Sequence, residues 1–94
     1  RSIELDSERA FPFNNRGFAY SNLGNYELAF ADFKASYNID PTNALLYKYR
    51  GLTYYKTENH PEALKDLLKA IEKDPDLEGE LTETLARLKE KSVP

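Results

Sequence analysis

The sequence predicts an all-α fold built from stacked antiparallel helix pairs. Similar residues recur 34 positions apart, in the pairs Phe13/Tyr47, Arg16/Arg50, Gly17/Gly51, Tyr20/Tyr54, Ala29/Ala63, Asp32/Asp66 and Phe33/Leu67. Within each unit, apolar and small residues fall at spacings of three and four, which places them on one face of a helix. A period of this length is typical of arrays in which each two-helix unit buries its apolar face against the next.

The period divides the chain into four segments. Residues 1–9 match the end of a unit, so we expect them to be the remnant of a preceding repeat helix. Two full units follow at residues 10–43 and 44–76, and residues 77–94 are expected to form a C-terminal capping helix and tail. The helices of the full units are expected to span about residues 10–23, 26–39, 44–57 and 61–73.

Local signals set the ends of these helices. Pro12 suits the first turn of a helix, where its missing N–H has no partner to lose. Gly24 suits the left-handed residue that closes a helix, and Asn25 suits the cap of the next one. Pro41 and Pro75 then end the second helix of each unit.

The last predicted helix deviates from the repeat. Its apolar stripe consists of Leu77, Leu81, Leu85 and Leu88. Leu85 stands where the repeat has Gly51, so this helix lacks the small residue that lets a partner helix approach closely. We therefore expect it to end the array as a cap with a polar outer face.

Composition argues against several classes of partner. The net charge of −3 argues against a protein that grips a phosphate backbone, and no apolar run reaches the length of a membrane span. The chain has no cysteine, which excludes disulfides and thiolate chemistry. We expect no partnership with nucleic acid or a membrane. The cytoplasm is the expected compartment, although no residue marks it.

Catalysis and cofactor binding are not expected. His60 is the single histidine and has no second ligand one turn away, so it makes no metal site. The acidic residues are spread over several helices, without an apolar pocket that would raise the pKa of one carboxylate. One histidine does not assemble a convincing Ser–His–Asp set, and a glycine-rich phosphate loop is missing. We predict that the chain is not an enzyme.

Two copies of one motif connect the sequence with a known family. The pattern Phe13-x-x-x-Gly17-x-x-Tyr20, followed by Ala29, Phe33, Ser36 and Pro41, resembles the tetratricopeptide repeat. A second copy consists of Tyr47, Gly51, Tyr54, Ala63, Leu67, Ala70 and Pro75. The resemblance covers residues 10–75 and implies a right-handed α-solenoid of antiparallel helix pairs. It also implies that a concave groove binds peptides or proteins.

The resemblance implies that the first helix of each pair lines this groove. The residues expected to bind a peptide are Phe11, Asn14, Asn15, Phe18, Leu45, Lys48, Tyr49, Leu52 and Tyr55, and Ser21, Asn22 and Lys56 extend the same face. On this hypothesis Asn15 orients the backbone of an extended peptide, while Phe18, Tyr49 and Leu52 accept an apolar side chain. An equally weighted alternative is that Phe11 and Phe18 pack against a preceding repeat or against the remnant at residues 1–9.

One binding mode within the family is rejected. A subgroup clamps the C-terminal carboxylate of chaperone tails with Lys and Arg on successive groove helices. Leu45 and Tyr49 stand where those cations are needed, and a carboxylate without cationic donors is badly placed.

A recurring Arg and Asp predict a structural ion pair. Asp32 and Arg50 both recur with the period, so we expect Asp32 of one unit to meet Arg50 of the next. On this interpretation Arg50 contributes to stability and not to ligand binding.

The sequence therefore predicts a non-catalytic protein-interaction module that binds a peptide or helix in its concave groove, as a fragment of a larger protein. The alternative is a structural spacer or self-association unit, with a homodimer formed through the N-terminal face. Stacked repeats generally need about three units for stability, and this chain has two full ones.

Overall fold

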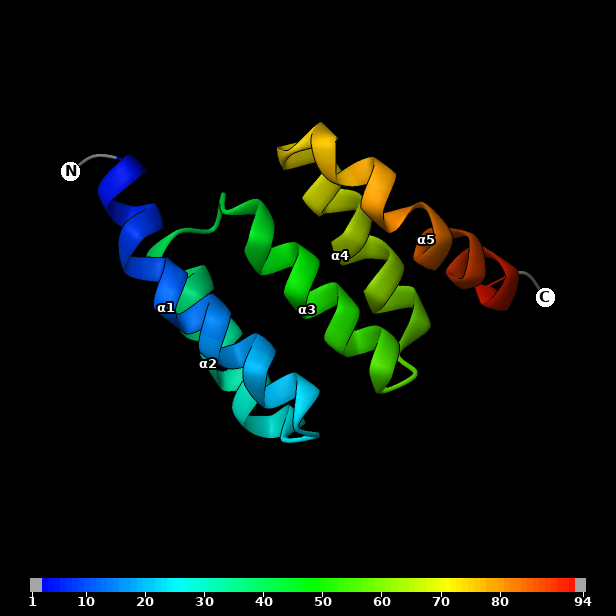
Figure 1. Cartoon of the computed structure of the whole chain (residues 1–94), viewed down its shortest axis with the longest axis horizontal. Helices are drawn as coiled ribbons and strands as arrows, with labels where there is room; N and C mark the ends of the chain where they lie inside the picture. Colours follow the sequence, from blue (N-terminus) through cyan, green and yellow to red (C-terminus); the bar gives the residue numbers. More distant parts are fainter. Residues whose placement is uncertain (1–2, 93–94) are drawn as a thin grey trace.

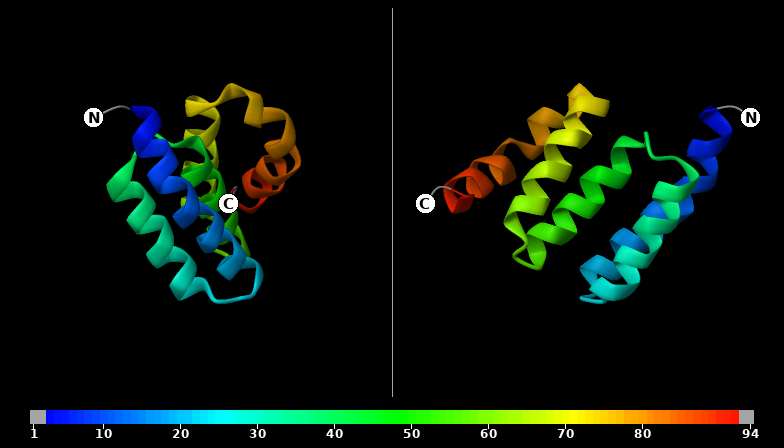
Figure 2. Two further views of the ribbon diagram at one scale, coloured as in Figure 1. Left: turned by 60° about the vertical axis from the view of Figure 1, so that its left-hand side comes forward. Right: turned by 180° about the vertical axis from the view of Figure 1, so that it is seen from behind.

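The computed structural model describes residues 3–92 of the chain and the side chains of residues 8–91. This part of the chain is all-helical, which confirms the predicted fold class. Its elements are α1 (Ile3–Asn22), α2 (Tyr26–Ile39), α3 (Ala44–Lys56), α4 (His60–Lys73), a 3₁₀ turn (Pro75–Leu77) and α5 (Glu78–Ser92). Helices α1 and α2 form one antiparallel pair and α3 and α4 form the next, with α5 beside α4 (Figure 1). The view from behind shows α2 and α4 in front of α1 and α3 (Figure 2, right).

A turn joins the two helices of each pair, and the two turns have the same backbone geometry. After α1, Gly24 adopts a φ of +85°, and the next backbone N–H donates to the carbonyl of Tyr20 at 2.9 Å. After α3, Glu58 adopts a φ of 64°, and the next N–H donates to the carbonyl of Tyr54 at 2.9 Å. Glycine reaches this left-handed conformation without a steric penalty, whereas a residue with a Cβ does not. The second turn therefore carries local strain that the first turn lacks.

The start of the first helix differs from the prediction. Helix α1 is continuous from Ile3, so residues 3–9 are its opening turns and not the end of a separate preceding helix. Pro12 consequently lies inside α1 and not in its first turn. The proline removes one intrahelical hydrogen bond, whereas a break there would leave a new set of four N–H groups without helical partners. Residues 1 and 2 of the predicted remnant lie outside the described residues.

A glycine lies where the two helices of each pair pack closely together. A Cβ on Gly17 would lie 2.7 Å from Cε1 of Phe33, and a Cβ on Gly51 would lie 2.8 Å from Cδ2 of Leu67. Carbon atoms at van der Waals contact are about 3.5–4.0 Å apart, so neither site has room for a larger residue without rearrangement. The recurrence of glycine with the period is explained by this close packing.

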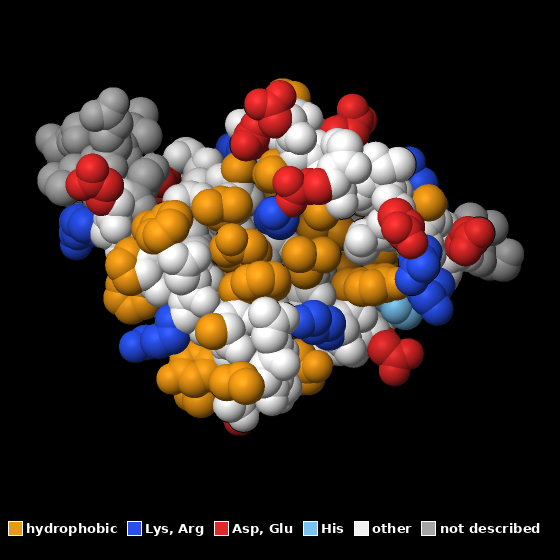
Figure 3. All heavy atoms as spheres, in the orientation of Figure 1, with side chains coloured by type: hydrophobic (Ala, Val, Ile, Leu, Met, Phe, Trp, Pro, Cys, Tyr) orange, Lys and Arg blue, Asp and Glu red, His pale blue; other side chains and the backbone are white. Residues whose placement is uncertain are grey.

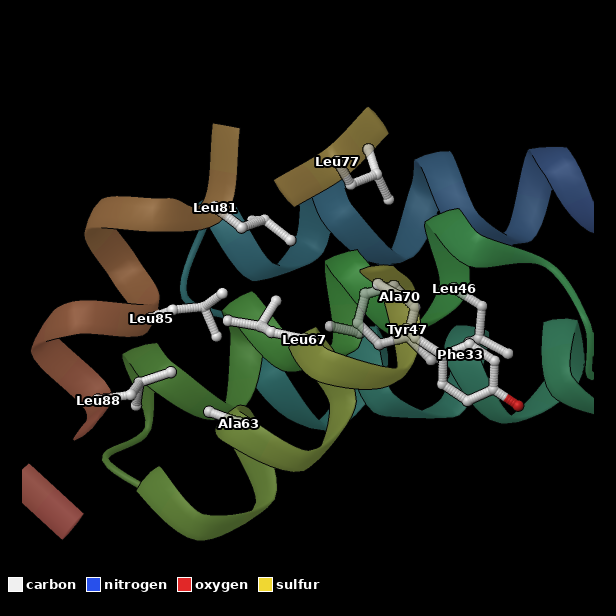
Figure 4. Close-up of a cluster of buried hydrophobic side chains, with 11 residues drawn as sticks. Phe33, Leu46, Tyr47, Ala63, Leu67, Ala70, Leu77, Leu81, Leu85 and Leu88 are labelled. Carbon is white, nitrogen blue, oxygen red and sulfur yellow. The ribbon is translucent and has the colours of Figure 1, made fainter. Parts of the chain in front are cut away.

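The apolar core runs through both pairs into α5. The buried side chains, most of which Figure 4 labels, are Ala29, Phe33, Leu46, Tyr47, Ala63, Leu67, Ala70, Leu77, Leu81, Leu85 and Leu88. The leucines of the predicted final stripe are all buried, and α5 packs against α4. Exposed side chains of α5 include Glu80, Glu83, Arg87 and Glu90. The described α5 thus extends the core of the second repeat, while its role as a cap stays a prediction.

Candidate functional site

The predicted site residues lie on α1 and α3, the first helices of the two pairs. We call the surface of these helices the α1/α3 face. Its exposed and partly exposed members include Phe11, Asn15, Phe18, Leu45, Lys48, Tyr49, Leu52, Tyr55 and Lys56. Figure 3 shows hydrophobic side chains gathered across the middle of the molecule, over α1 and α3, with basic and acidic side chains among them. All the residues predicted to bind a peptide except Asn14 are at least partly accessible, but Ser21, which was expected to extend the same face, is also buried.

Phe18 of α1 and Tyr49 of α3 form the aromatic centre of this face. Their ring centroids are 4.3 Å apart and their planes differ by 14°, which is a stacked arrangement. Both residues remain partly exposed. The stack joins the first helices of successive repeats and leaves aromatic surface available for contact with another molecule.

Polar contacts fix the register of α1 against α3. The Thr53 hydroxyl donates to Oγ of Ser21 at 2.8 Å, and this contact is buried. Lys56 Nζ donates to Oδ1 of Asn22 at 2.5 Å, at the surface. These contacts continue the α1–α3 seam beyond the aromatic stack, so the geometry of the face is set by side chains from both repeats.

Two lysines accompany the aromatic stack. Lys48 Nζ lies 5.7 Å from the ring centroid of Tyr49, and Lys56 Nζ lies 5.7 Å from that of Phe18. Lys48 also forms an ion pair with Glu80 of α5. Sequence reasoning missed this pairing, because it depends on where α5 docks and Glu80 itself carries no signal beyond its charge.

Tyr55 connects the face with α4 and α5. Its ring centroid lies 6.0 Å from that of His60, which is the first residue of α4. Arg87 of α5 contacts both Tyr55 and Glu83, and its Nη2 lies 2.8 Å from Oε1 of Glu83. The hydrogen bond to Tyr55, together with the charge of Glu83, raises the pKa of Arg87. The α5 helix therefore contributes charged side chains to one border of the α1/α3 face.

Asn14 does not belong to the accessible surface. It is 0% exposed, so a bound peptide has no Asn14 surface to contact, and its prediction as a binding residue is wrong for this arrangement. Helices α1 and α3 run in the same direction, and the Thr53–Ser21 contact places Leu46 level with Asn14. Asn14 thus lies on the stretch of α1 that runs beside α3. Neither its Oδ1 nor its Nδ2 has a hydrogen-bond partner within the described part of the chain.

The recurring Arg and Asp residues pair within each repeat. Arg16 Nε and Nη2 donate to the two carboxylate oxygens of Asp32 at 2.9 and 2.7 Å. The same fork joins Arg50 to Asp66 at 2.8 and 3.0 Å. The predicted ion pair between Asp32 and Arg50 is therefore wrong, because the antiparallel helices of one pair already bring residues 16 positions apart into contact. The hydrogen bond and the charge of Asp32 raise the pKa of Arg16.

We also searched the described residues for a metal-binding cluster and for a helix that could span a membrane. Among the side chains of residues 8–91, no group of three or more His, Cys, Asp or Glu is arranged to hold a metal ion. In the same part of the chain, no helix combines the length and apolar character needed to cross a bilayer. The features that distinguish the α1/α3 face are therefore its partly exposed aromatic rings and its lysines.

Paired antiparallel helices that repeat every 34 residues define a helical-repeat protein. Family models described as tetratricopeptide repeat match residues 10–43 and residues 44–77. The chain belongs to the tetratricopeptide repeat family. Repeats of this family are typically non-catalytic interaction modules, and the comparisons support a role in protein–protein interaction in general.

Three curated relatives share part of this sequence. The chain is 32% identical over 75 residues to small glutamine-rich tetratricopeptide repeat-containing protein 2 of Mycosarcoma maydis, covering 80% of this chain and 21% of that protein. It is 34% identical over 85 residues to the STIP1 homolog of Dictyostelium discoideum, covering 89% of this chain and 15% of that protein. It is 40% identical over 57 residues to bovine (Bos taurus) neutrophil cytosol factor 2, covering 61% of this chain and 11% of that protein. The chain thus spans about a fifth or less of each relative. No solved structure matches it.

Proposed function

We propose that the α1/α3 face binds a short peptide segment or a helix of another protein. The observation that carries this proposal is the Phe18–Tyr49 stack, which leaves two aromatic rings partly exposed where successive repeats meet. Leu52 lies close by on α3 and is also only partly buried. Contiguous exposed apolar surface of this kind commonly marks an interaction site.

Polar groups around the stack would orient the bound peptide. Asn15 is exposed on α1 and can both donate and accept hydrogen bonds, which suits the backbone of an extended peptide. Lys48 lies beside Tyr49 and supplies a cation. In this arrangement the aromatic rings provide most of the buried contact area, and the polar side chains set the direction of the bound segment.

Selection from a displayed peptide library tests the proposal. Peptides enriched on the wild-type chain are expected to lose binding to Phe18→Ser, because that change removes half of the aromatic stack. Leu68→Ser is the matched control, since Leu68 is a large apolar residue on α4 that is 48% exposed. Equal binding to both variants, with each one folded by circular dichroism, would contradict the proposal.

Self-association through the same surface is the second candidate. Phe11 is 50% exposed on α1, which leaves apolar surface that a second copy of the chain would cover. Sedimentation velocity over a concentration series separates the two functions. A wild-type dimer that Phe18→Ser converts to a monomer favours self-association, whereas a monomer in both cases favours binding of a different protein.

A further inference from the structure

The two lysines of the α1/α3 face lie at opposite ends of one aromatic site. Lys48 approaches the ring of Tyr49, and Lys56 approaches the ring of Phe18, each at 5.7 Å from the centroid. The lysines are eight residues apart on α3, which corresponds to about 12 Å along the helix axis. The stack therefore carries a cation toward each end, although the whole chain has a net charge of −3.

The charged groups of this face differ in how they are paired. Glu80 of α5 neutralises Lys48, and Glu83 of α5 neutralises Arg87. Lys56 is exposed and donates to the neutral side-chain amide of Asn22. Among the described residues, Lys56 is thus the cation beside the stack that forms no ion pair with a carboxylate. An incoming carboxylate meets Lys56 without first displacing another acid.

We propose that the ligand is an extended acidic peptide in which two carboxylates flank one apolar or aromatic side chain. This inference rests on the proposed function and specifies its ligand class. An extended chain rises about 3.3 Å per residue and directs alternate side chains to the same side. Residues i and i+4 are then about 13 Å apart, which matches the spacing of the lysines, and residue i+2 falls on the Phe18–Tyr49 stack.

The Lys48–Glu80 pair acts as an internal competitor in this arrangement. The Lys48 side chain is 18% exposed and that of Glu80 is 50% exposed, so the pair is open to solvent on its carboxylate side. An ion pair with an exposed partner contributes little, so a second carboxylate can compete with Glu80 for Lys48. The peptide first contacts Lys56, and its other carboxylate then takes the place of Glu80 on Lys48. Removal of the Glu80 charge is therefore expected to strengthen binding.

Fluorescence anisotropy with two labelled peptides tests the ligand class. The acidic probe is Ser-Glu-Ser-Phe-Ser-Glu-Ser, and in the matched probe Gln replaces both Glu residues. The acidic probe is expected to bind at least about tenfold more tightly at low ionic strength. That difference shrinks at about 0.5 M salt, where exposed charges are screened beyond a few ångströms.

Single substitutions test which charged side chains contribute to peptide binding. Lys56→Gln is expected to weaken binding of the acidic probe about fivefold, and Glu80→Gln to strengthen it about two- to fivefold. Lys69→Gln is the matched control for Lys56, because it makes the same change in net charge and Lys69 also lies over an aromatic ring, that of Tyr47 at 5.3 Å. This control is expected to leave affinity unchanged.

Several outcomes would overturn the inference. Equal binding of the two probes means that charge does not select the ligand, although Phe18-dependent binding would still support the proposed function. An equal loss of affinity in Lys69→Gln and Lys56→Gln means that only net charge matters. If neither probe binds while library peptides do, the ligand class is wrong and the proposed function stands. If the library also yields no binder, both proposals fail.

Discussion

Arg50 and Asp66 form a two-point ion pair inside the second repeat. Nε and Nη2 of Arg50 donate to the two carboxylate oxygens of Asp66, which is only 5% exposed. Burial by itself lowers the pKa of Arg50, but the hydrogen bond and charge of Asp66 outweigh it and raise the pKa. The guanidinium supplies donors and an opposite charge to a carboxylate that water scarcely reaches, and the pair therefore links α3 to α4.

Replacement of Arg50 tests this structural role. Arg50→Leu leaves the Asp66 carboxylate buried without a counter-charge, so the free energy of unfolding is expected to fall by about 2–4 kcal/mol. Urea denaturation followed by circular dichroism measures the change. The double variant Arg50→Leu/Asp66→Leu is the control and should recover part of the loss, because it leaves no unpaired charge. Unchanged stability together with lost peptide binding would assign Arg50 to the ligand instead.

Substitution of Gly17 by a larger residue is expected to destabilise the fold. A Cβ there would lie 2.7 Å from the ring of Phe33, a 0% exposed residue, and 3.1 Å from the backbone carbonyl of Ala29. Gly17→Ala should lower the free energy of unfolding by about 1–2 kcal/mol, since overpacking outweighs the gain in helix propensity. Gly79→Ala is the matched control, because nothing lies within 4 Å of a Cβ at that site. It should raise stability by up to about 1 kcal/mol. Destabilisation by both substitutions would contradict this account.

The buried side chain of Asn14 is expected to lower the free energy of unfolding. Its amide is 0% exposed, and both polar atoms lack partners in the described part of the chain. Asn14→Leu has a similar shape and removes this desolvation cost, so it should raise the free energy of unfolding by about 1–2 kcal/mol. Asn15→Leu is the control on the exposed neighbouring position and should change stability little. Thermal and urea denaturation of both variants provide the comparison, and a loss of stability in Asn14→Leu would show that the amide has a partner.

Tyr47 makes stability sensitive to alkaline pH. It is 2% exposed, and its hydroxyl donates to the carbonyl of Pro41 at 2.5 Å. Burial, with a further contribution from Tyr37, raises the pKa of Tyr47 above its ordinary value. A tyrosine in the unfolded chain titrates at about pH 10, so the folded state holds this proton more tightly. The resulting stability is complete below that pH and is lost as the pH rises through the folded-state value.

Tyr47→Phe isolates this contribution. The wild-type free energy of unfolding should fall more steeply than that of Tyr47→Phe between about pH 9 and about pH 11. The other titrating groups are common to both chains, so the difference between the two curves reports on Tyr47. Urea denaturation at a series of pH values measures it. Parallel curves would mean that the phenol ionises equally well in the folded chain.

Most helix boundaries follow from signals that lie beside them in the sequence. The predicted span 26–39 is the observed span of α2, and α3 and α4 each differ from prediction by one residue at one end. Gly24 and the two Asp-Pro steps are local determinants that act with little help from distant residues. The start of α1 is different, because Pro12 is compatible with either a first turn or a helix interior.

The partners of individual side chains depend on packing that periodicity does not define. Asp32 and Arg50 recur with the same period as the pairs that form, so the period alone does not distinguish pairing within a unit from pairing between units. Asn14 has a polar side chain, which favours exposure, and yet it is fully buried in the folded chain. The partly exposed Phe18 and Tyr49 were predictable from their helical positions, whereas their stacking required the register between α1 and α3.

The most direct test of the central claim is amide chemical-shift mapping by NMR, with the isotope-labelled chain titrated with a library-selected peptide. We expect the largest shifts along the α1/α3 face, around Phe18, Tyr49 and Lys56, with smaller changes on α2 and α4. Shifts concentrated around exposed Leu28 of α2 and Leu68 of α4 at saturating peptide would contradict the claim and place the interaction surface on the second helices instead.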